Sequence, residues 1–305
     1  MSYLNLLNLE KKRKFILKFL IIYTAVFTIF FMFIIGFIWD KFSNSYLYEY
    51  NELKILIVLI IAISLRGFYK FSVAYFDEHF REFKSEYKDA VLEPLFKRLN
   101  FKYSKFGHVH ALDIMHSGLL DGFDTQDGND FVRGSVGDVR FSFSDITLSR
   151  IKYSLFKDIM LGYLFSRTKK PKFMGLFYTA DFNKSIKTPI KITSKPKLFR
   201  TKILMDNYDF NELFNVYCSD MVFANYILTP VFMERLLTLE KFAKGGIKIS
   251  FDRNKIFIVL NKGKDSFEPN LLKSVKNRDN FVAIRHEIFA VLSIIKNLNL
   301  NEKIW

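Results

Sequence analysis

One stretch near the N-terminus constrains this chain more than any other. Phe19–Ile38 is 20 residues long and contains no charged side chain. A helix rises about 1.5 Å per residue, so this segment matches a hydrocarbon core of about 30 Å. The residues that follow, Trp39, Asp40 and Lys41, offer no small-residue cleavage site of the kind found after a signal peptide. We therefore expect a retained transmembrane helix at about residues 15–38.

A second apolar run, Ile55–Leu65, has only 11 residues, too few to span a bilayer alone. Extended to about residues 53–72 it gains Lys54 and Arg66, whose side chains can reach opposite membrane interfaces. The alternative is a core helix of a soluble domain. A second span is favoured because the run is apolar on all sides and follows a first span. Residues 1–76 are therefore expected to form an anchor of two transmembrane helices.

The basic residues around these runs predict the orientation. They precede the first span and follow the second: Lys11, Lys12, Arg13, Lys14, Arg66, Lys70, Arg81 and Lys84. The positive-inside rule then places both termini in the cytoplasm. The abundance of Phe, Ile, Lys and Asn is typical of an AT-rich bacterial genome, so the membrane is expected to be the bacterial inner membrane. The single cysteine excludes an internal disulfide and fits a reducing compartment.

The pattern after the anchor changes from helix to strand. Apolar residues recur three or four apart in 77–99, and we expect a stalk helix over residues 77–112. From Phe131 the period becomes two on either side of a turn at 136–138, which predicts a β-hairpin. Its core-facing residues are expected to be Val139, Phe141, Phe143 and Ile146.

Further elements complete an α+β domain at residues 113–305. We expect strands at 172–180, 188–193, 247–251 and 256–260, and helices at 230–242 and 280–298. Thr229 is the expected N-cap of the helix that begins at Pro230. Antiparallel strands with flanking helices make α+β the fold class, with this domain in the cytosol.

At this level the chain resembles an uncharacterised bacterial family of two-span membrane proteins, a domain of unknown function. The resemblance rests on "SGLLDGFDTQDGNDFVRGSVGDVRFSFSDI" (117–146), "GLFYTADFNK" (175–184), "YILTPVFMERL" (226–236), "FEP" (267–269) and "LNLNEKIW" (298–305). It implies two N-terminal spans and a cytosolic domain, and no particular activity. The family pattern has an acid near the end of the first hairpin, which is matched by Asp145. The other motif residues are Asp130, Gly134, Asp181, Asn183, Pro230, Phe267, Glu268 and Pro269.

Four aspartates fall at every third position before the hairpin: Asp121, Asp124, Asp127 and Asp130. An EF-hand loop needs a different spacing and a glutamate at its twelfth position, where this chain has Val132. Asp and Gly are also the residues that surface turns require. We interpret the run as a polar turn, with Asp130 capping the hairpin.

The segment with most resemblance to a metal site holds His108, His110, Asp113 and His116. On a helix, His110, Asp113 and His116 would share a face. The surrounding apolar residues fit an ordinary amphipathic helix, and we assign no metal site, cofactor or catalytic residue. An enzyme that uses Asp113, His116 and Asp130 around a metal is kept as an alternative.

The charge of the chain is concentrated in one strip. The net charge is +15, and residues 167–202 hold eleven basic side chains against one acid, Asp181. The basic residues are Arg167, Lys169, Lys170, Lys172, Lys184, Lys187, Lys191, Lys195, Lys197, Arg200 and Lys202. Such a strip on an anchored domain would be attracted to anionic lipid head groups. A solvated lysine face is the plain alternative.

The sequence thus predicts a membrane-anchored binding or scaffold domain without enzymatic activity. Its partner would be an anionic lipid or a protein. A membrane-tethered nucleic-acid binder is a further alternative, which we disfavour because the aromatic residues in the strip alternate as a strand core does rather than as a base-stacking platform.

Overall fold

The computed structural model describes residues 3–43, 66–68, 70, 72, 75–152, 168–194, 203–243, 246–277, 282, 285, 286, 288, 289 and 293. The chain forms two compact units. One comprises Met1–Val91 with Pro269–Asn280, and the other comprises Leu92–Glu268 with Phe281–Trp305.

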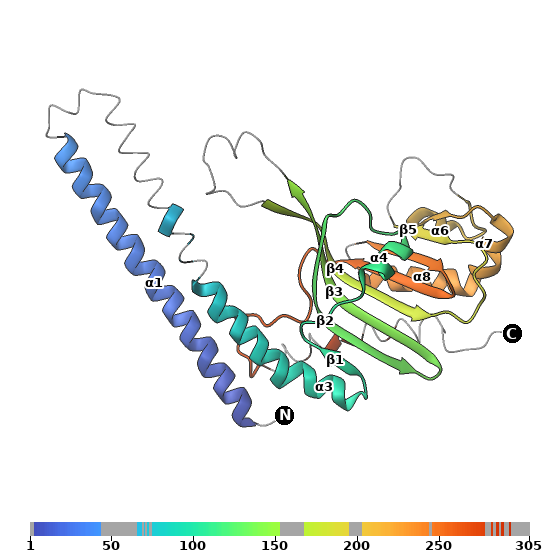
Figure 1. Cartoon of the computed structure of the whole chain (residues 1–305), viewed down its shortest axis with the longest axis horizontal. Helices are drawn as coiled ribbons and strands as arrows, with labels where there is room; N and C mark the ends of the chain where they lie inside the picture. The colour runs from blue at the N-terminus through green and yellow to red at the C-terminus, as the bar shows by residue number, and fades with distance from the viewer. Residues whose placement is uncertain are drawn as a thin grey trace. The chain divides into compact units, whose positions relative to one another are not determined.

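The first unit is built on one long helix, α1 (Tyr3–Ser43), drawn in blue in Figure 1. Within it, Asn5–Phe37 has the length and apolar composition to cross a membrane, and it is the single straight helix with both properties in the described part of the chain. Its large side chains are exposed, Phe33 at 73%. The predicted N-terminal apolar helix is thus confirmed. Of the predicted second span at 53–72, only residues 66–68, 70 and 72 are described.

A returning segment contacts α1 in antiparallel order. The ring of Phe68 stacks on Phe27 with centroids 3.6 Å apart. Lys12, near the start of α1, forms an ion pair with Glu86 at 2.6 Å. Because later residues of the returning segment contact earlier residues of α1, the first unit has the arrangement of a helical hairpin over these positions.

Polar contacts surround the first turns of α1. Arg13 pairs with Glu10 at 2.8 Å, and its Nη1 donates to the carbonyl of Leu271 at 2.5 Å. The amide of Val275 donates to Glu10 at 2.9 Å. A charged pair with main-chain partners from another segment belongs outside a hydrocarbon core. These residues precede the charge-free run Phe19–Ile38 of α1.

The second unit is an antiparallel sheet with the strand order β1-β2-β3-β4-β8-β7-β5-β6 (Figure 1). The strands are β1 (Lys102–Ser104), β2 (Thr125–Val136), β3 (Val139–Lys152), β4 (Thr168–Asp181), β5 (Ile190–Thr193), β6 (Asn215–Tyr217), β7 (Ile247–Asp252) and β8 (Lys255–Asn261). The α+β class and the antiparallel sheet are confirmed. The two edge strands, β1 and β6, have three residues each.

Two hairpins organise this sheet. β2 and β3 meet at Gly137, which adopts a φ of 59°. β7 and β8 are joined by Arg253 and Asn254, with φ values of 51° and 56°. Two consecutive residues of positive φ match the right-handed twist of the flanking strands, so the turn is tight and fixes the register.

Short helices flank the sheet: α3 (Glu93–Arg98), α4 (Ala111–Ser117), α6 (Tyr208–Leu213), α7 (Met221–Ile227) and α8 (Pro230–Ala243). The hydroxyl of Thr229 accepts a hydrogen bond from the amide of Phe232 at 3.4 Å, as expected of the N-cap of α8. Of the predicted helix at 280–298, six scattered residues are described.

Both faces of the sheet are buried. On one face, Ile114 of α4 packs with Ile146, Phe177 and Phe257. On the other, Phe143 lies against Phe96 of α3, with centroids 6.3 Å apart. The hairpin alternation therefore holds, but Ile146 points away from Phe143 and lines a second core.

The helix predicted to form a stalk over 77–112 is shorter than expected. Residues 75–87 are helical, a π-helical turn follows at Lys88–Leu92, and α3 ends at Arg98. Asn100 then adopts a φ of 60°, a left-handed conformation that ends a helix. α3 belongs to the sheet unit, because Phe96 packs into its core. That unit therefore begins at Leu92 rather than at 113, and it does not contain 269–280.

Candidate anion-binding pocket

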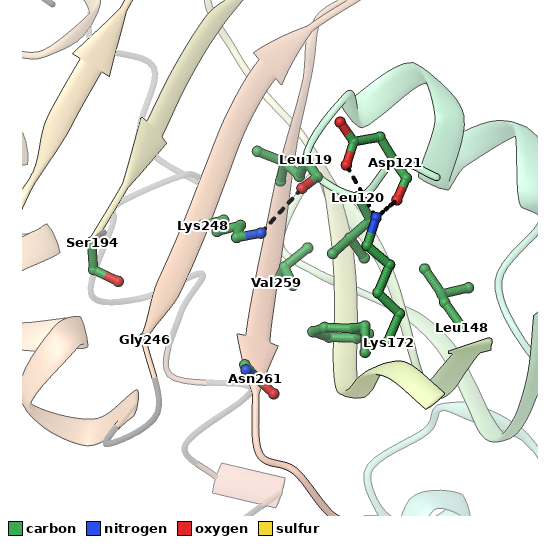
Figure 2. Close-up of a pocket in the computed structure, with 11 residues that line it drawn as sticks. Leu119, Leu120, Asp121, Leu148, Lys172, Ser194, Gly246, Lys248, Val259 and Asn261 are labelled. Atoms are coloured by element: carbon green, nitrogen blue, oxygen red, sulfur yellow. Dashed lines mark hydrogen bonds and ion pairs between the residues drawn. The ribbon is translucent and has the colours of Figure 1, made fainter. Parts of the chain in front are cut away.

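A pocket of about 150 Å³ lies over one face of the sheet, beside the loop that follows α4 (Figure 2). Its floor is apolar and its rim carries two lysines. The lining residues are Leu119, Leu120, Asp121, Leu148, Lys172, Phe173, Ser194, Gly246, Lys248, Val259 and Asn261.

The two rim lysines come from different strands and reach the same loop (Figure 2). Lys172 of β4 donates to the carbonyl of Asp121 at 2.5 Å, and its Nζ lies 3.7 Å from the Asp121 carboxylate. Lys248 of β7 donates to the carbonyl of Leu119 at 3.4 Å. β8 separates β4 from β7 in the sheet, and both lysines line the pocket.

Two more cations approach this loop. Lys191 of β5 lies so close to Gly118 that a side chain there would collide with its ammonium group. A Cβ added to Gly122 would meet Lys172 Nζ at 2.9 Å and a guanidinium nitrogen of Arg150 at 3.3 Å. The two glycines thus let the basic side chains approach the main chain.

The electrostatic balance of the pocket rim is positive. Four cations surround residues 117–122, a stretch whose single acid is Asp121. The side chain of Asp121 is 84% exposed, so solvent screens its charge. A cationic rim over an apolar floor suits a ligand with an anionic head and an apolar body, since ammonium groups bind phosphate and carboxylate oxygens.

The structure divides the predicted basic strip. Lys172 and Lys191 reach the pocket loop, and Lys170 and Lys187 are exposed. Lys184 instead donates to the carbonyl of Tyr226 at 2.8 Å, and burial lowers the pKa of its ammonium group. Lys169 is in β4, but its side chain is outside the described residues, as are Arg167, Lys195, Lys197, Arg200 and Lys202.

Sequence reasoning missed Arg150 and Lys248, because both lie outside the strip. A signal existed in the strand alternation of 247–251, which predicts that Lys248 points to the face opposite Ile247 and Ile249. The register that brings it beside the loop after α4 comes only from the structure.

The histidine and aspartate candidates have other partners. His110 caps α4 by accepting from the amide of Leu112 at 3.2 Å. Asp113 lies 3.5 Å from Lys255, and His116 accepts from Arg253 at 3.0 Å. Within the described residues these side chains form no ligand group, and Asp130 gathers with a different set of carboxylates.

The remaining motif residues serve different roles. Gly134 lies against the ring of Phe101, where a Cβ has no room, and Asp181 pairs with Arg140 at 2.7 Å. Asn183 is exposed, and Pro230 opens α8. Phe267 is buried with a φ of 58°, and Pro269 begins the segment that belongs to the first unit. Asp130, Asp145 and Glu268 are treated below.

Residues 171–300 match a family model described as "Protein of unknown function (DUF3137)". This range contains the "GLFYTADFNK", "YILTPVFMERL" and "FEP" segments, and it agrees with the expected resemblance to an uncharacterised family. No curated protein matches the chain.

The comparison with solved structures found the mycobacterial trehalose monomycolate transport factor A, TtfA. The two chains are 8% identical, with a TM-score of 0.36 over 67% of this chain and 90% of that one.

Proposed function

We propose that this chain is a membrane-anchored binding protein whose sheet domain engages the phosphate-bearing head group of an anionic lipid. The observation that carries the proposal is the convergence of Lys172 and Lys248 on one loop over an apolar floor. In the structure these ammonium groups donate to main-chain carbonyls, which a phosphate oxygen with a full charge would replace. The apolar floor would accept the first carbons of the lipid.

The proposed location is the bacterial inner membrane, with both termini in the cytoplasm. The support is α1 together with the returning segment, whose Ser72 shares a hydrogen bond of 2.7 Å with Tyr23. A chain that returns along α1 brings the sheet domain to the side on which it started. That side carries the basic cluster at 11–14, so the sheet domain would lie on the side of the anionic inner leaflet.

The lipid proposal is tested by calorimetric titration of the full chain in a neutral detergent with dihexanoyl phosphatidylglycerol. We expect saturable binding that the doubly substituted Lys172→Gln/Lys248→Gln variant weakens about thirtyfold, since each lysine contributes about 1 kcal/mol. Dihexanoyl phosphatidylcholine, which has no net charge, should not bind.

The matched control is Lys170→Gln/Lys187→Gln, which removes the same charge from exposed lysines of the strip. It should bind nearly as the wild type does. Equal weakening by both pairs would show that the strip attracts anions without a site. Competition by a single-stranded oligonucleotide at equal phosphate concentration would favour the nucleic-acid alternative.

The orientation is tested by fusing cytoplasmic and periplasmic reporters after Trp305. Only the cytoplasmic reporter should be active there. The same reporters fused after Asn51, between the two proposed spans, should give the opposite result. A periplasmic signal after Trp305 would contradict the second span and remove the pocket from the inner leaflet.

A further inference from the structure

A second cluster of charged side chains lies in the sheet unit, outside the pocket. Asp130, Asp265 and Glu268 offer carboxylate oxygens that all lie within 4.8 Å of one another. Asp130 is fully buried and sits at a bulge in β2, where its φ is 55°. Asp265 and Glu268 lie beyond the end of β8. Three carboxylates from two segments thus meet at one place.

A fourth carboxylate, that of Asp145, is buried beside them. Asp145 lies on β3 opposite Asn129, and its side chain is on the same face as Phe143. One oxygen accepts from the amide of Ser266 at 2.7 Å, next to Asp265 in the chain. The other oxygen, Oδ1, has no hydrogen-bond partner among the described residues, although Asp145 is only 3% exposed. A buried carboxyl oxygen without a hydrogen-bond partner is energetically unfavourable, so Oδ1 points to a missing ligand.

The surroundings of Asp145 are strongly anionic. Burial, together with the negative charges of Asp265 and Asp130, raises the pKa of Asp145 to about 8. Lys262 opposes this effect and lowers the pKa. The net effect on Asp145 is still a raised pKa, so a further positive charge beside it would be favourable.

Neighbouring polar groups fix the directions of these carboxylates. The hydroxyl of Tyr103 donates to Asp130 Oδ1 at 2.5 Å, and Asn129 Nδ2 donates to Asp265 Oδ2 at 3.0 Å. The amide oxygen of Asn129 is buried and has no partner among the described residues. Asn129 therefore orients one carboxylate and leaves a neutral oxygen available beside it.

We propose that Asp130, Asp265 and Glu268, together with the neighbouring Asp145, bind one divalent cation of the oxygen-preferring class, calcium, magnesium or manganese. Two ligands that are each about 2.4 Å from an ion can be at most about 4.8 Å apart, the spread of the three carboxylates. The ligand set holds no histidine or cysteine, which disfavours zinc and copper. The cation joins the β2 bulge, β3 and the segment after β8.

The test uses the full chain in detergent, stripped of metal with EDTA and then freed of the chelator. CaCl₂, MgCl₂ and MnCl₂ are titrated separately by calorimetry, and unfolding is followed by far-UV circular dichroism. We expect at least one of these ions to bind with one site per chain. At about 100 times its Kd it should raise the Tm by about 5 to 10 °C.

Asp145→Asn separates a metal ligand from a structural carboxylate. The amide is nearly isosteric, keeps an acceptor for Ser266 and carries no charge. In metal-free buffer at pH 9, where the Asp145 carboxyl is ionised, we expect this variant to have a higher Tm than the wild type, because the amide carries no buried negative charge. We also expect the ion to bind at least tenfold more weakly and its effect on the Tm to be lost.

Asp138→Asn, at the exposed hairpin turn, removes the same charge from the same sheet and should behave as the wild type does. Absence of binding by all three ions in millimolar concentration would overturn the proposal. So would an equal loss of binding in Asp138→Asn and Asp145→Asn, since that result would indicate a diffuse charge effect. Unchanged affinity in a folded Asp145→Asn variant would also overturn it.

Discussion

Replacing Phe143 with alanine should lower the free energy of unfolding of the sheet domain by about 3 to 5 kcal/mol, the usual cost of truncating a buried aromatic ring. Phe143 is fully buried, and its ring lies 6.2 Å from that of Phe267 and 6.3 Å from that of Phe96. The cavity would open where three separate segments meet, and none of them can close it without moving main chain.

The effect is measured by urea denaturation of the full chain in detergent, with circular dichroism as the readout. Phe106→Ala is the control, since Phe106 belongs to the same unit and is 75% exposed. Phe106→Ala should lower the free energy of unfolding by less than about 0.5 kcal/mol. Similar values for the two variants would contradict the packing described for this core.

Gly175→Ala is expected to lower the free energy of unfolding by at least about 3 kcal/mol, because the new methyl group would meet main chain rather than a movable side chain. Gly175 lies in β4 opposite Asn261 of β8. A Cβ at this position would collide with the carbonyl oxygen of Leu260 and lie 2.9 Å from the amide of Lys262. Relief requires the two strands to separate, which breaks the ladder between the two halves of the sheet.

Gly263→Ala provides the comparison for Gly175→Ala. Gly263 has a φ of 64° and open space around its Cα. Alanine there should lower the free energy of unfolding by about 1 to 2 kcal/mol, the strain of holding a left-handed conformation. The same denaturation measurement applies. If Gly175→Ala cost no more than Gly263→Ala, the close approach of β4 and β8 would be wrong.

The regular parts of the fold could be predicted from the sequence. The charge-free run near the N-terminus indicates α1, and the turn at Gly137 indicates the β2–β3 hairpin. Alternation correctly places Phe141 and Phe143 on one face. Alternation does not show that the opposite face is also buried. Ile146 lies on that opposite face, in a different core from the one expected.

The candidate sites could be predicted less well, because they depend on strand register. Lys172 was identified from the basic strip, but Lys248 lies 76 positions later in the sequence and reaches the same loop only through the β4–β8–β7 pairing. Asp130 was interpreted as a cap for the hairpin turn. In the structure Asp130 lies at a bulge with positive φ and is buried. Local sequence patterns do not predict such a bulge.

The shortness of the edge strands has a consequence for how the domain associates with other molecules. β1 and β6 each have three residues, and the amide of Ile203 already donates to the carbonyl of Val216 at 2.9 Å on β6. An added strand would therefore find few open main-chain groups at either edge. If the proposed anchor brought copies together in one membrane, they would have little tendency to polymerise through their sheets, and side-chain surfaces would have to supply any specific association.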